Sequence, residues 1–175
     1  MIYPPAAYTI RNFTQDESPA YRAIRLRALE DAPDAFGSTH AAEAALPPEH
    51  WAARVTRSIS AGIDHALVAE MDGRMVGLAW AKVDADDPAI VNLFQMWVAP
   101  EARGHGVAAG LLGEAVRWAQ ARGALAMQLG VNCANAAALG LYARAGFVDT
   151  GLREPLKAGS DLMEQRMRLS FAATQ

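Results

Sequence analysis

The sequence predicts an α/β domain with a mixed sheet, and three observations lead to this fold class. The chain of 175 residues suits a single domain that is large enough to bury a core. Its composition, 52% hydrophobic and 20% charged, is ordinary for a globular protein. Segments with strand and helix periodicity follow in the order β-α-α-β-β-β-α-β-α-β-β, without a repeat or linker, so we expect one domain over residues 1–175.

The N-terminal third predicts one strand and two helices. Tyr8–Phe13 alternates weakly and is typical of a strand, and residues 16–30 show a helical spacing that Pro33 ends. A second helix is expected to begin near Pro48 after a long loop, because proline suits the first helical turn. The expected apolar contacts of the first helix are Ala20, Ile24, Leu26 and Leu29.

Three strands joined by short turns are predicted next. The segments His65–Met71 and Arg74–Val83 are separated by Asp72-Gly73, which is a strong hairpin signal. Ala89–Val98 forms a third, largely apolar strand, so these segments should make an antiparallel meander.

The second half of the chain alternates between helices and strands. Val107–Arg122 carries an apolar stripe at helical spacing, and Gly123 suits its C-terminal cap. Residues 125–131 alternate as in a strand, and Asn135 suits the N-terminal cap of a helix that runs to Ala145. The last two strands are expected at residues 147–150 and 162–169.

Charge and composition exclude several classes of function. The net charge is −3, whereas a general nucleic-acid binder needs a basic face. No apolar run approaches the ~18 residues that a membrane span needs, and the first ten residues lack the regions of a signal peptide, so a cytoplasmic protein is expected. Cys133 is the only cysteine, so an intramolecular disulfide is impossible and no metal site is expected.

Basic charge is concentrated in one part of the chain. Residues 102–148 contain four basic and one acidic residue, which gives +3, so the rest of the chain carries −6. An anionic ligand is expected to bind in this part, although an alanine-rich helical surface can also show such a bias by chance.

The glycine-rich turn RGHGVA at residues 103–108 lies at the start of this basic part. A P-loop is excluded, because no lysine followed by serine or threonine comes after Gly106. Gly104, Gly106 and Ala109 match the dinucleotide fingerprint literally. That interpretation is disfavoured because residues 115–148 contain no acidic side chain for the ribose, and because the turn follows an antiparallel meander.

A third interpretation takes Arg103 as part of the pattern R-x-x-G-x-A. Small residues keep side chains out of the turn, so several backbone N–H groups can point at one anion. The helix that follows adds the positive end of its dipole, an arrangement suited to a pyrophosphate.

A second motif, NAAALGLYARAGF at residues 135–147, completes the pattern. Together the two motifs resemble the GNAT superfamily of N-acetyltransferases, with R/Q-x-x-G-x-G/A opening one helix and N-x-x-A-x-x-L-Y-x-x-x-G-F on the next. The matching residues are Arg103, Gly106, Ala108, Asn135, Ala138, Leu141, Tyr142, Gly146 and Phe147. The element order and the segment ALEDAPDAFGS also match, so the resemblance covers nearly the whole chain. It implies the GNAT fold, a central mixed, mostly antiparallel twisted sheet flanked by helices.

The resemblance implies that the protein binds acetyl-CoA as a cosubstrate and transfers the acetyl group directly to an amine. The amides of residues 103–108 would hold the pyrophosphate. Residues 94–98 would pair with the pantetheine arm, in a V between this strand and residues 124–131. Asn135 would lie beside the cofactor, or would serve only as a helix cap. The residues implied to bind the cofactor are Met96, Trp97, Val98, Arg103, Gly104, His105, Gly106, Val107, Ala108 and Asn135.

The resemblance also implies that Tyr142 is the general acid that protonates the departing thiolate. Tyr142 lies seven positions after Asn135, so the two residues share a helical face. Reference pKa values of ~8.5 for a thiol and ~10 for tyrosine are close enough for proton transfer or a shared hydrogen bond. The alternative is a tyrosine that only packs in the core.

A general base is not evident in the sequence. An amine with a pKa near ~10 is protonated at neutral pH, so a group must accept its proton. Many relatives use a glutamate on the strand before the turn, but here residues 88–100 contain no acidic side chain, and Asn92 and Gln95 cannot act as bases. The alternatives are a water relay, a carboxylate from elsewhere such as Glu70, or an acceptor of low pKa. Acetyl-enzyme chemistry at Cys133 is disfavoured because the thiol lacks a clear base partner.

The acceptor is expected to enter near the first two helices. Asp31, Asp34 and Glu43 there either favour a cationic substrate or are solvated surface charges. The expected partner is a small-molecule or peptide amine, rather than nucleic acid or a membrane, and the resemblance leaves a homodimer open. The alternative functions are a module that binds acyl-CoA without catalysis and a dinucleotide-binding enzyme.

Overall fold

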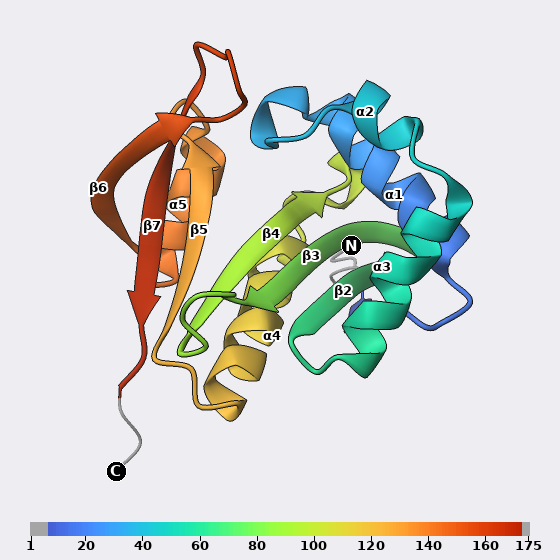
Figure 1. The fold of residues 1–175 in the computed structure, drawn as a ribbon, viewed down its shortest axis with the longest axis horizontal. Helices are drawn as coiled ribbons and strands as arrows, with labels where there is room; N and C mark the ends of the chain where they lie inside the picture. Colours follow the sequence, from blue (N-terminus) through green and yellow to red (C-terminus); the bar gives the residue numbers. More distant parts are fainter. Residues whose placement is uncertain (1–6, 173–175) are drawn as a thin grey trace, which may run out of the picture.

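Seven strands form one twisted sheet in the order β1-β2-β3-β4-β5-β7-β6 in the computed structural model, which describes residues 7–172 (Figure 1). The strands are β1 (Tyr8–Asn12), β2 (Asp64–Met71), β3 (Arg74–Val83), β4 (Ile90–Val98), β5 (Ala126–Asn132), β6 (Val148–Pro155) and β7 (Met163–Ser170). Neighbouring strands are antiparallel except for β4 and β5, which are parallel. The expectation of a mixed, mostly antiparallel sheet is therefore confirmed.

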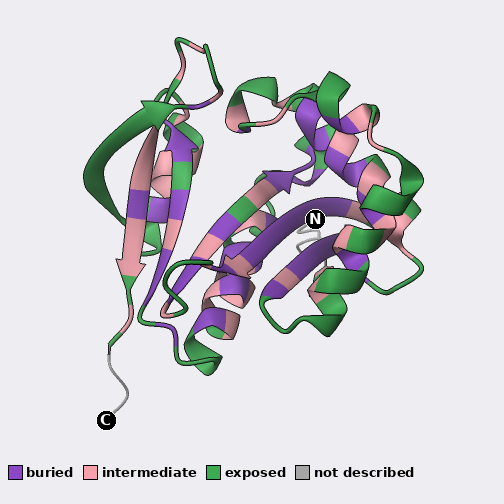
Figure 2. Cartoon of the chain, in the orientation of Figure 1, coloured by how far each residue is buried: buried purple, intermediate pink, exposed green. Residues whose placement is uncertain are grey.

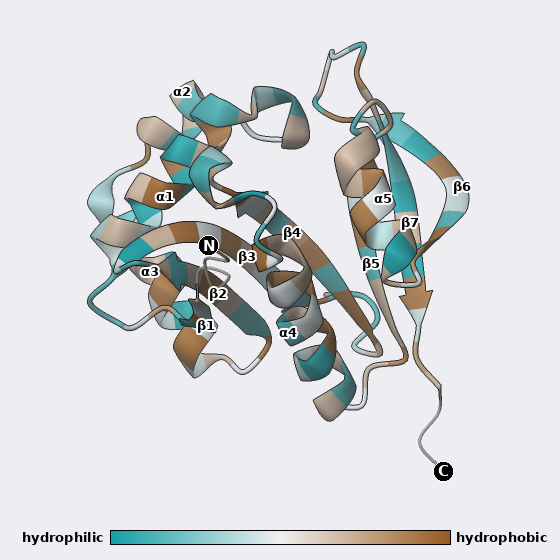
Figure 3. Cartoon of the chain, turned by 180° about the vertical axis from the view of Figure 1, so that it is seen from behind, coloured by the Kyte–Doolittle hydropathy of each residue, from teal (hydrophilic) through white to brown (hydrophobic). Residues whose placement is uncertain are grey.

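Helices cover both faces of this sheet. They are α1 (Ser18–Asp31), α2 (His40–Ala44), α3 (Pro48–Ser60), α4 (Val107–Ala121) and α5 (Ala136–Arg144). In Figure 1, α3 lies in front of β2, whereas Figure 3 shows α4 and α5 on the opposite face, against β2–β4 and β5 respectively. Between residues 7 and 172, no helix is both long enough and apolar enough to cross a bilayer.

Two elements differ from the sequence-based expectation. The helix α2 lies in the segment expected to be a loop, and the Thr39 hydroxyl caps it by accepting a hydrogen bond from the Ala42 amide at 3.2 Å. The strand β6 extends to Pro155, beyond the expected end at residue 150, and each of its residues is exposed. An edge strand without a buried face has no apolar alternation, which explains why the pattern missed its second half.

The buried stripe of α1 is also shifted from the expected one. Its buried residues are Tyr21, Ile24, Arg25, Ala28 and Leu29, whereas Ala20 and Leu26 are only partly buried. The reason is Arg25, whose guanidinium is buried against the Glu43 carboxylate at 2.8 Å. A charged residue in the buried stripe cannot be recognised from apolar spacing alone.

Burial is uneven across the sheet. Figure 2 shows buried residues along β2, β3 and the inner face of α4, whereas β6 is exposed throughout. Trp51, Tyr21, Leu67, Leu78, Leu111 and Met127 are among the largest fully buried side chains. The strand β4 pairs with β3 up to Val98, whereas it pairs with β5 only over Ile90–Asn92. The rest of its β5-facing edge forms no strand pairs within the described residues.

Candidate active site

The strands β4 and β5 pair only at one end. Ile90–Asn92 pairs with Ala126–Gln128, and no further pairs form within the described residues. Beyond Asn92 the two strands diverge, as Figure 1 shows, while β4 continues to pair with β3 up to Val98. The resulting V lies where the sequence predicts the cofactor.

A β-bulge lies on β4 at the mouth of this V. The register with β3 shifts between Leu78 and Trp80, and Gln95 has a φ of 56°, which is unusual for a residue other than glycine. The Gln95 side chain is held by the Tyr21 hydroxyl, which donates to Oε1 at 2.9 Å. A bulge bends a strand and redirects its side chains, so the end of β4 turns away from a regular sheet geometry here.

A cavity of about 630 Å³ lies between the end of β4, the start of α4 and α5. We call it the larger cavity. Every site residue predicted from the sequence except His105 lines it, namely Met96, Trp97, Val98, Arg103, Gly104, Gly106, Val107, Ala108, Asn135 and Tyr142. His105 is exposed and turns its ring nitrogen toward the backbone oxygen of Arg103 at 3.1 Å.

The turn into α4 leaves backbone N–H groups without partners in the helix. Gly104 and Gly106 have φ values of 80° and 81°, which favour glycine, and Gly106 starts the helix without a side-chain cap. The first amides of α4 cannot bond within the helix, and the residues that carry them line the cavity, so these amides are available as donors at the positive end of the dipole. The arrangement can bind an anion such as a diphosphate.

Arg103 is held in place by two interactions. Its Nε donates to the Val98 carbonyl at 3.0 Å, and its Nη2 donates to Asp31 Oδ2 at 2.5 Å. Asp31 also accepts a hydrogen bond from Trp97 Nε1 at 2.9 Å. The hydrogen bond from Trp97 and the charge of Arg103 lower the pKa of the Asp31 carboxyl. Asp31 thus lies in one wall of the larger cavity, where Trp97 and Arg103 engage its carboxylate.

Arg144 is a cationic residue of the larger cavity that sequence reasoning counted but assigned no role. It is the last residue of α5, is exposed, and lines the cavity. Its guanidinium lies back over Gly140, where a Cβ would be 3.0 Å from Nη1. The charged residues that line this cavity are Arg103, Arg144 and Asp31, so their net charge is positive.

Asn135 and Tyr142 stand on one face of α5, as their spacing predicts. The Asn135 side chain accepts a hydrogen bond from the Ala138 amide at 3.1 Å, so it caps α5 and also lines the cavity. Tyr142 is 6% exposed, its ring packs on Phe147, and its hydroxyl has no hydrogen-bond partner among residues 7–172. Burial raises the pKa of Tyr142, so the phenol stays protonated and remains able to donate.

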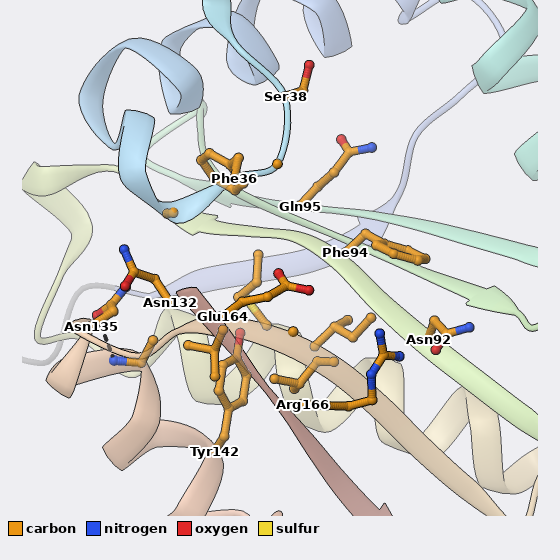
Figure 4. Close-up of a pocket in the computed structure, with 18 of the residues that line it drawn as sticks. Phe36, Ser38, Asn92, Phe94, Gln95, Asn132, Asn135, Tyr142, Glu164 and Arg166 are labelled. Atoms are coloured by element: carbon orange, nitrogen blue, oxygen red, sulfur yellow. Dashed lines mark hydrogen bonds between the residues drawn. The ribbon is translucent and has the colours of Figure 1, made fainter. Parts of the chain in front are cut away.

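A second cavity, of about 490 Å³, opens on the other side of Tyr142. We call it the smaller cavity, and Figure 4 shows it with the Tyr142 hydroxyl directed inward. The residues that line both cavities are Ala35, Met96, Asn135, Ala138 and Tyr142. The two cavities therefore meet at the tyrosine.

The smaller cavity carries charged side chains of both signs. Arg25 and Arg166 line it, as do two carboxylates, Asp84 and Glu164. Asp84 accepts hydrogen bonds from Asn92 and from the Asp86 and Asp87 amides, and these contacts lower its pKa. Sequence reasoning missed Glu164 because it lies on β7, far along the chain from both motifs.

The other residues considered for acceptor binding or proton transfer lie elsewhere. Glu70 on β2 lines neither cavity and pairs with Arg11 at 2.8 Å. Glu43 is buried in an ion pair with Arg25, and Asp34 is exposed and lines neither cavity. Cys133 is exposed and lines neither cavity.

Comparison with known proteins identifies relatives in sequence. The model of the Acetyltransferase (GNAT) family matches residues 21–147. Mycothiol acetyltransferase from Stackebrandtia nassauensis is 33% identical over 149 residues, which cover 82% of this chain and 45% of that protein. Phosphinothricin N-acetyltransferase from Alcaligenes faecalis is 31% identical over 153 residues, which cover 83% of this chain and 73% of that protein. The chain thus spans less than half the length of the mycothiol acetyltransferases.

Solved structures share the fold over nearly the whole chain. An acetyltransferase of the GNAT family from Streptococcus pneumoniae superposes with a TM-score of 0.81 at 24% identity, covering 94% of this chain and 100% of that one. Ribosomal-protein-alanine N-acetyltransferase from Brucella melitensis gives 0.77 at 27% identity, covering 93% and 99%. A putative acetyltransferase from Salmonella typhimurium, solved with acetyl-CoA, gives 0.77 at 23% identity, covering 97% and 99%.

The family model covers well over half of the chain, and it includes both motifs that line the larger cavity. The fold is shared with solved acetyltransferases over more than nine-tenths of the chain. The chain belongs to the acetyltransferase (GNAT) family.

Proposed function

We propose that this chain transfers an acetyl group from acetyl-CoA to a primary amine of a small molecule or peptide. The observation that carries the proposal is the meeting of two cavities at Tyr142, one suited to an anionic cosubstrate and one polar enough for an amine. The names of the relatives include both small-molecule and ribosomal-protein acetyltransferases, which is consistent with an amine acceptor.

The larger cavity has the properties that acetyl-CoA requires. The uncapped amides of the α4 turn would hold the diphosphate, with Arg103 and Arg144 adding positive charge. The free edge of β4 from Phe94 to Val98 would bind the pantetheine arm through backbone hydrogen bonds, beside Met96 and Val98. When bound, the thioester supplies an activated acetyl group.

The location of Tyr142 in the lining of both cavities supports a role for it at the leaving group. Its hydroxyl would donate a proton or a strong hydrogen bond to the thiolate as the carbon–sulfur bond breaks. The raised pKa keeps the hydroxyl protonated until this moment. Its ring is fixed against Phe147, with centroids 5.7 Å apart, so the donor is held in position before the reaction.

The smaller cavity would receive the amine. Phe36 and Phe94 supply aromatic walls, and Asp84 and Glu164 supply carboxylates that attract an ammonium group. Arg25 pairs with Glu43, a carboxylate that it shares with Arg54, and the other lining arginine, Arg166, pairs with Glu154 at 3.3 Å. The lining carboxylates Asp84 and Glu164 have no ion-pair partner within the described residues. A cationic amine is therefore a better match to this cavity than an anionic ligand.

The test combines ligand binding with product release. Acetyl-CoA and CoA should raise the Tm of the protein in a thermal shift assay, because each binds the folded state, whereas NADH should not. A panel of primary alkyl amines and peptide N-termini, followed by release of free CoA, should then identify an acceptor. Stabilisation without CoA release from any amine would instead indicate a module that binds acyl-CoA without catalysis.

A further inference from the structure

Glu164 lies on β7 at the edge of the smaller cavity. The sheet register places it opposite Asn132 on β5 and opposite Glu154 on β6. Figure 4 shows the Glu164 carboxylate extending into the cavity that the Tyr142 hydroxyl also enters. The strand order β5-β7-β6 is what brings residue 164 beside the two sequence motifs.

The Glu164 carboxylate is half-buried and lacks a hydrogen-bond or ion-pair partner within the described part of the chain. Its side chain crosses β5 at Gly130, where a Cβ would lie 2.6 Å from the carboxyl oxygens. Gly130 therefore provides the room that this carboxylate occupies. Other acidic groups near this cavity already have partners: Asp84 accepts hydrogen bonds and Glu154 pairs with Arg166. Glu164 differs from them because its carboxylate has none within the described residues.

The other groups around the cavity are less suited to accept a proton. Asp84 accepts three hydrogen bonds that lower the pKa of its carboxyl, so it is a weaker base. No histidine among residues 7–172 lines either cavity. Arg25 and Arg166 cannot act as bases, and Tyr142 is protonated. Glu164 is left as the group with the required chemistry.

We propose that Glu164 is the general base that deprotonates the acceptor amine, an inference that rests on the proposed acetyltransferase function. An N–H bond of the ammonium breaks, an O–H bond forms on the carboxylate, and the electron pair stays on nitrogen. This pair is then available to attack the acetyl carbonyl. The carboxyl group returns its proton to solvent through the open cavity before the next cycle.

The surroundings of Glu164 tune it for this role. Burial raises the pKa of its carboxyl, the nearby Arg166 guanidinium opposes this rise, and the Glu154 carboxylate on β6 reinforces it. Tyr142 on α5, which is neutral, and Arg25 on α1, which shares the Glu43 carboxylate with Arg54, also face the cavity. A base is more effective as its pKa approaches the working pH, provided that it is still ionised there.

The decisive test is the pH profile of Glu164→Gln with the acceptor found in the amine screen. At neutral pH, kcat/KM should fall by about 10²-fold, a typical contribution of general-base catalysis. The wild type should lose activity as the pH falls through the raised pKa of Glu164, and should reach a plateau above it. The variant should instead gain activity tenfold per pH unit up to the pKa of the amine, because it can use only free amine.

Two matched variants separate proton transfer from structure. Glu114→Gln removes the charge of a carboxylate on α4 that pairs with Arg117 and lines neither cavity, and this variant should retain the wild-type pH profile. Gly130→Ala should displace the Glu164 carboxylate without removing it and should lower kcat more than it raises KM. Carboxyl ¹³C NMR gives a readout without turnover: the signal lost in Glu164→Gln should titrate above the ordinary glutamate pKa of about 4.3.

The outcomes distinguish the two levels of the proposal. A Glu164→Gln variant with wild-type kcat/KM and an unchanged acid limb would overturn the role of Glu164 while leaving the acetyltransferase function intact. A carboxyl signal that titrates at or below the ordinary glutamate pKa would count against it as well. Absence of both CoA release and stabilisation by acetyl-CoA in the wild type would overturn both proposals.

Discussion

The larger and the smaller cavity share Tyr142 but handle charge in different ways. The larger cavity presents backbone amides from the α4 turn, two arginines and one aspartate, whereas the smaller cavity presents two arginines, two carboxylates and side-chain amides. Of the lining carboxylates, those of the smaller cavity have no ion-pair partner within the described residues, whereas Asp31 is paired with Arg103. The larger cavity can stabilise negative charge through fixed dipoles, which need little reorganisation. The smaller cavity offers an acceptor for a proton. Under the proposed function, the larger cavity would bind the anionic acetyl donor and the smaller cavity would activate the cationic amine.

The ion pairs that border the two cavities differ in how far they are buried. Arg25 and Glu43, beside the smaller cavity, are 5% and 6% exposed, whereas Arg103 and Asp31, at the larger cavity, are 53% and 26% exposed. A buried pair costs much to break, because the remaining charge is left without a partner. An exposed pair is screened by water and contributes little to stability.

The largest expected effect is therefore on stability and concerns the buried pair. Glu43→Gln should lower the free energy of unfolding by about 3–5 kcal/mol, since it leaves Arg25 uncompensated. The matched change Asp31→Asn should cost less than about 1 kcal/mol. Urea unfolding followed by tryptophan fluorescence measures both values, and equal losses in the two variants would contradict this comparison.

The next largest effect is expected at the residue that joins the two cavities. Tyr142→Phe should lower kcat by roughly 10²-fold or more, because it removes the proton donor to the leaving thiolate. The affinity for CoA should be nearly unchanged, because the ring still packs on Phe147. Steady-state kinetics and calorimetric CoA binding separate these terms. An unchanged kcat would remove Tyr142 from the role of general acid.

A negative charge at the start of α4 should act on the larger cavity alone. Ala108→Asp places a carboxylate at the second residue of the helix, where it repels a bound phosphate and should raise the Kd for acetyl-CoA by at least about tenfold. The same change should leave the Tm equal or higher, because an acidic residue suits a helix N-terminus. Ala108→Ser is the neutral control, and weaker binding by that variant to the same degree would rule out the electrostatic explanation.

The smallest effect is expected for Arg144, which is exposed. Arg144→Gln should weaken acetyl-CoA binding by about threefold at low ionic strength, and the difference should vanish near 0.5 M salt. Arg117→Gln changes an exposed arginine of α4 that lines neither cavity, and serves as control. A loss that persists in high salt would point to a direct packing role for Arg144 instead.

Much of the larger cavity was predictable because its determinants are local. The glycines that enter α4 and the cap at Asn135 depend on positive φ angles and on side-chain hydrogen bonds between near neighbours. The spacing of seven between Asn135 and Tyr142 places both residues on one helical face regardless of the rest of the fold. For this reason the predicted residues lie together, apart from the outward-facing ring of His105.

The smaller cavity was not predictable, since its charged residues come from distant segments. Asp84 follows β3, Arg25 belongs to α1, and Glu164 lies on β7. The absence of an acidic residue before the turn was visible in the sequence, but the location of a substitute was not. Glu70, the carboxylate considered from the sequence, lies on β2 and is paired with Arg11.

The sequence by itself thus determined the order of the strands and of the longer helices, the glycine turn that enters α4 and the place of Tyr142 on α5, because each follows from local periodicity and backbone preference. Only the tertiary structure decided which carboxylate accompanies them. The strand β7 inserts between β5 and β6, which sets residue 164 beside Gly130 and over the cavity. Such a pairing between segments more than thirty residues apart leaves no signal in local spacing, and it depends on the global arrangement of the sheet.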